Sequence, residues 1–512
     1  MTFDSSKLKF IVIAVLALFV ALYLGITSAT AQVETIAWVV GALTMVPCLL
    51  LGKRVWLLIP FLGSLHLTLM IQGRPDTMLV AQCLVIGFST LMFLARKLPF
   101  RVQFSEVEWW ILLLFLCVLQ VYLRNPVGLN MFGGSQVGGR PYLLFVLALF
   151  TALILCGLRV PAIQLKTALK LSILGGVLNF TIGFLGWLWA PFGYWFGMAG
   201  TVANAPEIQQ EALDTERTTR IEFVRRLAHT LALAVSSFRN PLTAIFSVRW
   251  APLVLLSLAL AAASGFRNVV GAIGLTYLVG IFYRGGIVAL IASSLAAGIA
   301  VALLALVNLA TPLPPNIQRS LSFLPGTWEE RYILDSKSST DWRVEMWKEV
   351  LFTERWIENK VFGDGLGFSA RELALQGQLR ETKHTTGLGM SGFDVAREYV
   401  LINGDYHSGP VSAVRTIGYV GLTVMFLMQL RMMVLAHRQI QRCRGTEWFP
   451  VALFFGIPII WYPFFFTFIF GGFGVDGITI LMNAGILRLL ENNLPLPAYA
   501  RARTTVAFPS AP

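Results

Sequence analysis

Long apolar runs, each close to the length of a membrane-spanning helix, fill most of the chain and alternate with short polar connections. A helix needs roughly 20 mostly apolar residues to cross the hydrocarbon core of a bilayer. The pattern therefore predicts an all-α fold, a polytopic membrane helix bundle of about 12–14 spans. The expected spans lie near residues 10–26, 35–51, 55–72, 77–95, 108–123, 141–158, 171–190, 221–248, 250–265, 268–283, 286–310, 412–434, 449–470 and 475–490.

One long stretch, residues 311–411, departs from this pattern. It holds 11 Lys and Arg and 14 Asp and Glu, which is 25 of the 67 charged residues of the chain. Charged side chains and unpaired backbone groups are too costly to place in hydrocarbon. The chain is thus expected to consist of a transmembrane bundle (1–310), a mostly helical water-facing loop domain (311–411), and C-terminal transmembrane helices with a tail (412–512).

The charge distribution gives the expected orientation. The formal net charge is +13; the 311–411 loop carries −3, so 29 Lys and Arg against 13 Asp and Glu leave +16 for the rest. Basic loops tend to stay on the cytoplasmic side, and the most basic connections are 53–54, 96–101, 159–170 and 431–444. Placing these inside puts the N-terminus inside and the 311–411 loop outside.

Composition excludes several classes of protein. Hydrophobic residues make up 56% of the chain and charged residues 13%, well below the roughly 25% usual in soluble domains. A nucleic-acid-binding protein would need a basic, soluble, aromatic-rich face, which the pattern does not offer. The five cysteines avoid the loop and have neither disulfide nor zinc spacing. We expect no metal site and no cofactor.

Within the loop, residues 340–351 have helical periodicity. Thr340 or Asp341 is a suitable N-cap, and apolar residues recur at the i, i+4 and i+8 positions Trp342, Met346 and Val350. Arg343 borders this apolar face. Its planar guanidinium suits a carboxylate or a phosphate, and the alternative is an ordinary helix pair with Glu345 or Glu349.

Two further loop features attract attention. Residues 361–368 carry glycines at alternate positions, which indicates a tight turn; the alternative, a phosphate-binding loop, would need a flanking strand and helix. His407 stands just before the span at 412–434, where a histidine can transfer protons near neutral pH. The alternative for His407, and for the more remote His384, is an incidental loop histidine.

Several arginines are expected on the outer face. Arg267 links two short spans, and Arg140 and Arg220 lie in other outer connections. A cluster of such side chains at the membrane surface would suit an anionic diphosphate, whereas a single one is equally explained by snorkelling. Trp347 and Tyr406 are candidates for stacking on sugar rings, with a place in the small core of the loop as the alternative.

Taken in order, four features resemble the O-antigen ligase and polymerase family of bacterial envelope glycosyltransferases. They are a Ser-x-x-Arg turn (264–267), an Arg-x-x-x-Trp pair (343–347), a Gly-rich turn (362–368), and a loop-terminal histidine followed by Gly-x-x-Gly (407 and 418–421). The resemblance covers roughly residues 220–435.

The resemblance implies a multi-pass protein of the cell inner membrane, with the 311–411 loop in the periplasm. It also implies metal-independent transfer of a glycan from a polyprenyl-diphosphate carrier to an acceptor, either a lipid core or another lipid-linked glycan. Arg267 and Arg343 would neutralise the leaving diphosphate, Arg220 would assist at the lipid headgroup, and His407 would act as general base or orient the acceptor hydroxyl.

Two other functions stay open. A transporter or flippase for a lipid-linked saccharide would bind its substrate near mid-membrane, at broken helices with buried ionisable residues, whereas charge here concentrates in one outer loop. A receptor-like scaffold without catalysis is the third reading, and the outer arginines count against it. The sequence does not separate a ligase from a polymerase.

Overall fold

A computed structural model describes residues 51–69, 75–101, 103–127, 139–189, 221–324, 326–368, 372, 374, 401–402, 404 and 406–495. Within these ranges every regular element is a helix, and β pairing is limited to two isolated bridges. The all-α prediction is therefore confirmed for the described chain. The expected span near 10–26, that near 35–51 apart from Leu51, Arg220 and His384 lie outside it.

Eight helices of the described chain are long and apolar enough to cross a membrane. They are α4 (Thr77–Leu94), α5 (Glu106–Arg124), α6 (Arg140–Gly157), α7 (Ala162–Leu188), α13 (Arg267–Ala310), α18 (Gly409–Cys443), α19 with its π-helical extension η3 (Phe449–Ile469), and α20 (Phe473–Asn493). The other elements are η1 (Gly52–Leu57), α3 (Leu58–Leu65), α10 (Glu222–Phe238), α11 (Pro241–Ala244), α12 (Ala251–Ala263), α14 (Pro315–Leu321) and α15 (Glu330–Phe352).

This number is smaller than the expected 12–14 spans for identifiable reasons. Helix α13 covers two expected spans and is broken at Gly286, whose φ of 75° and ψ of −169° are not helical. The expected span near 55–72 is only η1 and the eight-residue α3, which ends where His66 adopts a left-handed conformation. The expected spans at 221–248 and 250–265 contain α10 and α12, which have only 17 and 13 residues.

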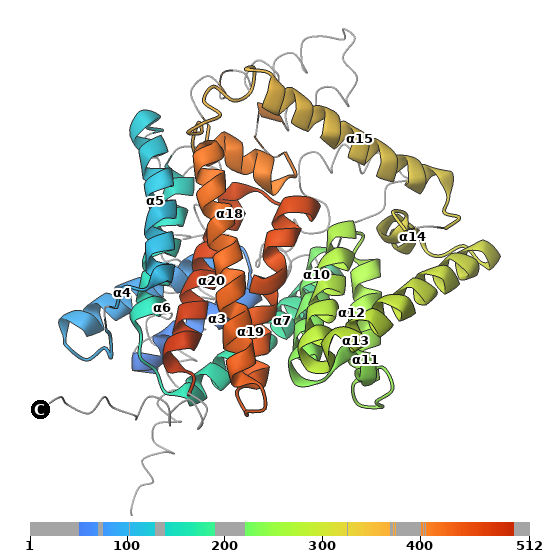
Figure 1. The fold of residues 1–512 in the computed structure, drawn as a ribbon, viewed down its shortest axis with the longest axis horizontal. Helices are drawn as coiled ribbons and strands as arrows, with labels where there is room; N and C mark the ends of the chain where they lie inside the picture. The colour runs from blue at the N-terminus through green and yellow to red at the C-terminus, as the bar shows by residue number, and fades with distance from the viewer. Residues whose placement is uncertain are drawn as a thin grey trace, which may run out of the picture.

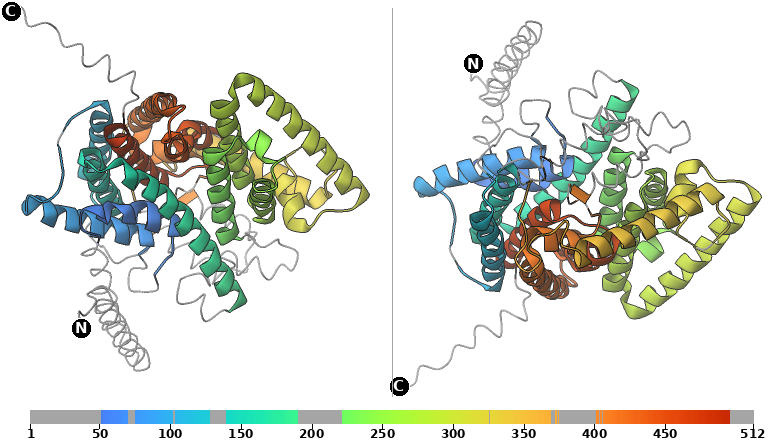
Figure 2. Two further views of the ribbon diagram at one scale, coloured as in Figure 1. Left: turned by 90° about the horizontal axis from the view of Figure 1, so that it is seen from below. Right: turned by 90° about the horizontal axis from the view of Figure 1, so that it is seen from above.

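The helices form two groups that meet at α10. Figure 1 shows α4, α5 and α6 on one side of α18, and α12 and α13 on the other. Helix α10 contacts α7, α12, α13 and α19, so the expected span of lowest apolarity holds the centre of the bundle. Seen from above, α15 crosses over the bundle between these two groups (Figure 2).

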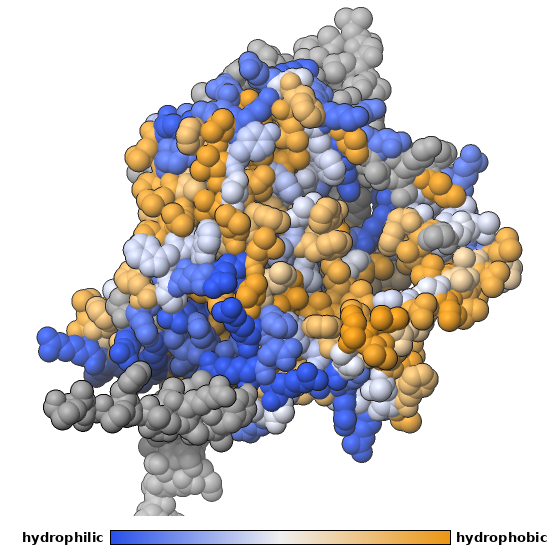
Figure 3. Space-filling model, in the orientation of Figure 1, coloured by the Kyte–Doolittle hydropathy of each residue, from blue (hydrophilic) through white to orange (hydrophobic). Residues whose placement is uncertain are grey.

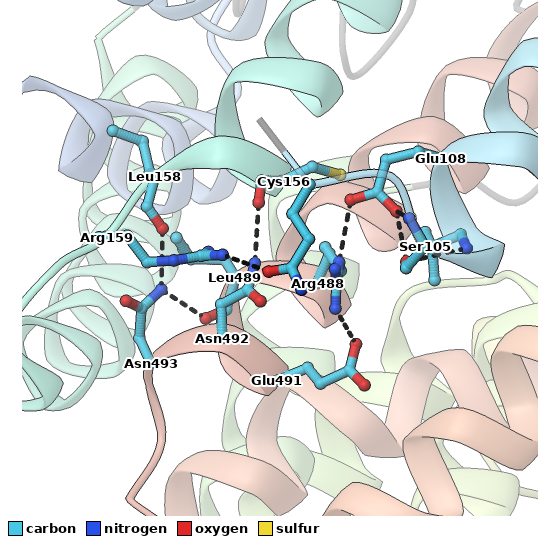
Figure 4. A network of polar contacts seen from close by, with 12 residues as sticks. Ser105, Glu108, Cys156, Leu158, Arg159, Arg488, Leu489, Glu491, Asn492 and Asn493 are labelled. Atoms are coloured by element: carbon cyan, nitrogen blue, oxygen red, sulfur yellow. Dashed lines mark hydrogen bonds and ion pairs between the residues drawn. The ribbon is translucent and has the colours of Figure 1, made fainter. Parts of the chain in front are cut away.

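A buried ion pair and a more exposed one fasten one end of the bundle (Figure 4). Arg488 of α20 donates from Nε to Glu108 of α5 (2.9 Å) and from Nη1 to Glu491 (2.7 Å), and the side chains of Arg488 and Glu108 are 7% and 6% exposed. Ser105 caps α5 by a capping box with Glu108. Asn493 donates to the Leu158 carbonyl, which ties α20 to the end of α6.

The opposite end of α5 meets the polar loop. Arg124, its last residue, donates to the carbonyl of Gly363 (2.7 Å), so α5 runs from the ion-pair network to the Gly-rich turn. In Figure 3 hydrophilic residues gather near α15 at the top and in a band across the lower part, with hydrophobic residues between them. This is the surface of a multi-pass membrane protein.

Candidate functional site

His407 lies at the entrance to α18. Ser408 is the N-cap residue and Gly409 begins the helix, as the position just before an expected span predicted. The φ of His407 is 49°, in the left-handed region that residues other than glycine seldom adopt. Such conformations persist only where the surroundings enforce them, and they concentrate at functional sites.

Two aromatic rings from distant elements lie against the His407 imidazole. The Trp342 ring centroid, from α15, is 6.4 Å away. The Phe470 ring, from the connection between η3 and α20, is 5.5 Å away with an interplanar angle of 29°, a stacked arrangement. The loop domain and the C-terminal helices thus meet at this histidine.

The helix that carries Trp342 is longer than predicted. Helix α15 begins at Glu330 with Glu329 as its N-cap, so neither Thr340 nor Asp341 is the N-cap and the predicted start was wrong. The predicted apolar face is confirmed, because Met346 and Val350 are both 0% exposed. They form a small core under α15 with Leu401, Tyr406, Val411 and Val414.

Arg343 and Arg267 approach each other from α15 and from the first residue of α13. Burial lowers the pKa of Arg343, and the positive charge of Arg267 lowers it further. The Arg343 Nε is buried, and no described residue accepts a hydrogen bond from it. Among the described residues no ion pair joins Arg343 to Glu345 or Glu349. Glu349 accepts from Trp356 Nε1 and pairs with Arg355. The two guanidinium groups are thus near enough to repel each other, and planar guanidinium groups suit an anion such as a phosphate.

The turn that precedes Arg267 is fixed by its neighbours. Ser264 ends α12, and its carbonyl accepts from the Ile221 N–H (3.1 Å) at the start of α10. Arg267 Nε donates to the Arg319 carbonyl of α14 (3.1 Å). The guanidinium of Arg225 lies 5.5 Å from the Phe266 ring centroid and pairs with Glu222. Arg225 was not among the predicted site residues, although a charged residue inside an otherwise apolar run was an available signal.

Trp347 and Tyr406 support the site from within. The Trp347 Nε1 donates to the Tyr406 carbonyl (2.8 Å), next to His407. Tyr406 is 0% exposed, and burial raises the pKa of its hydroxyl to about 12. The Tyr406 ring therefore belongs to the small core of the loop and offers no open surface for stacking on a sugar. The alternative to the predicted sugar-stacking role holds for Tyr406.

Arg140 is not brought to this group. It begins α6, on the side of α18 that faces α5 (Figure 1). The nearby Tyr142 hydroxyl accepts from the Leu366 N–H (2.9 Å), which places this end of α6 beside the Gly-rich turn. Among the described residues no contact joins Arg140 to Arg267 or Arg343.

The Gly-rich turn completes a broken helix. Helix α18 is interrupted at Gly418, whose φ is 71° and ψ 179°, so its N–H and C=O groups cannot pair as in a continuous helix. The turn supplies the partners instead. Four hydrogen bonds cross the break, from Tyr419 N–H to Lys360 O (2.8 Å), Val420 N–H to Val361 O (3.1 Å), Asp364 N–H to Arg415 O (2.7 Å) and Gly365 N–H to Thr416 O (3.1 Å).

Glycine is required on both sides of this contact. A Cβ on Gly418 would lie 2.2 Å from the Val361 oxygen, and one on Gly363 would lie 2.6 Å from the Gly418 nitrogen. Asp364 accepts from the N–H groups of Glu358 and Asn359 (both 2.8 Å) and shapes the turn. Burial raises the pKa of Asp364. The tight-turn interpretation is confirmed. The turn hydrogen-bonds to the backbone groups of α18 that the break at Gly418 would otherwise leave without helical partners.

A buried arginine lies behind the His407 loop. Arg415 is 7% exposed, forms an ion pair with Glu372, and lies against Gly404, where a Cβ would be 2.5 Å from its Nη1. Arg415 lies within the expected span at 412–434. An arginine inside such a span is rare enough in membrane proteins to have marked it.

The arrangement can bind an anion and accept a proton from a neighbouring hydroxyl. Among the described residues, no group of three or more His, Cys, Asp and Glu side chains lies close enough to hold a metal ion. A scan against models of known protein families finds none that matches this chain, and a search of curated proteins finds no significant similarity.

Proposed function

We propose that this protein is a glycosyltransferase that moves a glycan from a polyprenyl-diphosphate carrier to an acceptor hydroxyl, without a metal ion, at the periplasmic face of the cell inner membrane. The observation that carries the proposal is the position of Arg343, which the positive charge of Arg267 reaches, on the same helix that brings Trp342 to His407. These residues come from α13, α15 and the start of α18. The motif order that resembles O-antigen ligases and polymerases adds to this geometry.

The site residues can support each step of the glycosyl transfer. The acceptor hydroxyl oxygen attacks the anomeric carbon, the bond from that carbon to the phosphate oxygen breaks, and the electron pair leaves with the diphosphate. Arg267 and Arg343 stabilise the charge that develops on the diphosphate. The proton of the hydroxyl passes to the His407 imidazole. The donor lipid tail lies in the bilayer beside the bundle, and Arg220, in the predicted role, assists at its headgroup.

The polar end of the bundle favours this reaction over transport. Transporters use unwound helix segments whose free carbonyls coordinate ions. In α18 the carbonyls of Arg415 and Thr416 each accept a hydrogen bond from the Gly-rich turn, so the turn already occupies this break. A flippase for a lipid-linked saccharide remains the second candidate, and it would move the lipid without changing its covalent structure.

The test is transfer by the purified full-length protein with a polyprenyl-diphosphate-linked oligosaccharide, several lipid and glycan acceptors, and EDTA. We expect the wild type to release polyprenyl diphosphate and extend or re-anchor the glycan. His407→Asn and Arg343→Ala should lose activity; asparagine is chosen because it tolerates the left-handed backbone of position 407. Arg355→Ala is the matched control, because Arg355 is exposed and already paired with Glu349.

The product also separates the acceptor classes. A glycan attached to a lipid core identifies a ligase, and a longer lipid-linked glycan identifies a polymerase. Equal activity of the wild type and both site variants would refute the assigned site. Movement of intact lipid across a vesicle membrane, with no transfer to any acceptor, would refute the enzyme and favour the flippase.

A further inference from the structure

Phe470 contacts the His407 imidazole although nothing in its sequence surroundings distinguishes it from other aromatics of the C-terminal spans. Its ring is stacked on the imidazole, with 5.5 Å between centroids and 29° between planes. Trp342 contacts the same imidazole at 6.4 Å and 53°. Phe470 has no hydrogen-bonding atom, so it cannot itself give or take a proton in a reaction at His407.

The backbone that carries Phe470 is unusual and firmly held. It directly follows the π-helix η3 (Phe465–Ile469). π-Helices are rare overall, and those that occur are often found at functional sites. The Gly472 N–H donates to Asp476 Oδ2 (2.7 Å), and the Tyr462 hydroxyl donates to the other oxygen of the same carboxylate. This carboxylate therefore anchors both sides of the turn that presents Phe470.

The same turn is fastened to the start of α18. The Phe473 N–H donates to Ser412 Oγ (3.0 Å). A Cβ on Gly409 would lie 2.4 Å from the Phe466 ring, and one on Gly471 would lie 2.8 Å from the Gly409 Cα. Gly409 is two residues after His407, so the turn and the histidine backbone are positioned against each other with little freedom.

We infer that Phe470 is a positioning residue that sets the plane of the His407 imidazole for proton transfer. The inference rests on the proposed function for its catalytic consequence. A stacked ring restricts rotation of the imidazole and keeps one ring nitrogen directed at the acceptor site. Because displacement of a reacting group by about 1 Å can reduce the rate about 100-fold, loss of the ring should reduce kcat while substrate binding by Arg267 and Arg343 persists.

The kinetic test compares three variants of the full-length protein. We expect Phe470→Ala to lower kcat by about 10- to 100-fold with KM for the lipid-linked donor within about twofold of wild type. Phe470→Tyr keeps the stacked ring and should restore kcat. Phe468→Ala is the matched control, since Phe468 belongs to the π-helix η3, which Phe470 directly follows, and its side chain is 72% exposed. Unchanged kcat in Phe470→Ala, or an equal loss in Phe468→Ala, overturns the inference.

An NMR experiment tests the contact between the Phe470 and His407 rings and does not depend on enzymatic activity. The chain has five histidines, so protein labelled with ¹³C at histidine Cε1 gives a small set of signals, and His407→Asn identifies the one from His407. Loss of the Phe470 ring current should shift that signal in Phe470→Ala, with little change in Phe470→Tyr and Phe468→Ala. A His407 signal that stays in place overturns the inference. If the shift occurs but the wild type transfers no glycan, the proposed function fails and the contact between the two rings stands.

Discussion

Arg343→Ala should lower the transfer activity of the protein while leaving its thermal stability equal to or slightly above that of wild type. In the protein without substrate, burial and the charge of Arg267 both disfavour the Arg343 cation, as its lowered pKa indicates. Repulsion between two like unit charges near a protein surface is on the order of 1 kcal/mol. Removing one charge relieves this repulsion, and no hydrogen bond to a described residue is lost at Nε. The thermal stability of the variant should therefore equal or slightly exceed that of wild type.

Activity should fall sharply in the same variant. Loss of one donor to a developing negative charge typically reduces the rate about 10²- to 10³-fold, or about 2.7–4 kcal/mol of transition-state stabilisation. Arg343→Lys keeps the charge but not the planar fork, so we expect a smaller loss. Such a trade of stability for function is common at active sites.

The assay combines transfer kinetics with thermal unfolding in the presence of pyrophosphate. A ligand present at 100 times its Kd stabilises the folded state by about 2.7 kcal/mol, so pyrophosphate should raise the Tm of the wild type and of Arg355→Ala. It should not raise that of Arg343→Ala. A fall of several degrees in Tm for Arg343→Ala, or a full response to pyrophosphate, would show that Arg343 stabilises the fold and does not bind the anion.

Three other variants test the contacts that support the site. Arg488→Ala should destabilise the protein by about 3–5 kcal/mol, because it leaves the Glu108 carboxylate buried without its partner; a loss below 1 kcal/mol in reversible unfolding would contradict the buried pair. Gly418→Ala should destabilise more than Gly445→Ala, since both glycines have positive φ but only Gly418 has the turn within 4 Å. Equal effects on Tm would mean that backbone conformation alone matters. Burial raises the pKa of Asp364, so its contribution to stability is largest below the unfolded pKa of about 3.9 and decreases as pH rises through the folded value. Asp364→Asn should remove this part of the pH dependence, and an unchanged profile of Tm against pH would disprove it.

The long helices were largely predictable because a membrane-spanning helix satisfies its own backbone hydrogen bonds. The expected spans at 77–95, 108–123 and 141–158 match α4, α5 and α6 to within two residues at each end. Predictions failed where local breakers or polar ends intervened. His66 ends α3 early, and α7 begins well before the expected 171 because its first turns carry polar residues such as Lys166.

The candidate site was predictable only in part. His407, Arg343 and Arg267 were chosen as residues suited to proton transfer and anion binding, and the structure places their elements together. Phe470 was missed because it lies in an apolar run, where sequence does not reveal which side chain faces a functional group. Arg415 was missed although an arginine in an apolar span is a usable signal. Tyr406 was assigned to the substrate because sequence does not distinguish an aromatic residue of a small core from an exposed one.

By itself, the order of apolar and polar residues determined that this is an all-helical membrane protein with one polar loop, since hydrophobicity and helix length are local properties. Only the tertiary structure decided which residues meet. The filling of the α18 break by the turn at 360–365, the approach of Arg343 to Arg267, and the stacking of Phe470 on His407 each join segments far apart in the chain. Such contacts depend on how whole helices pack, because a few degrees of crossing angle move a side chain at the end of a helix by several ångströms.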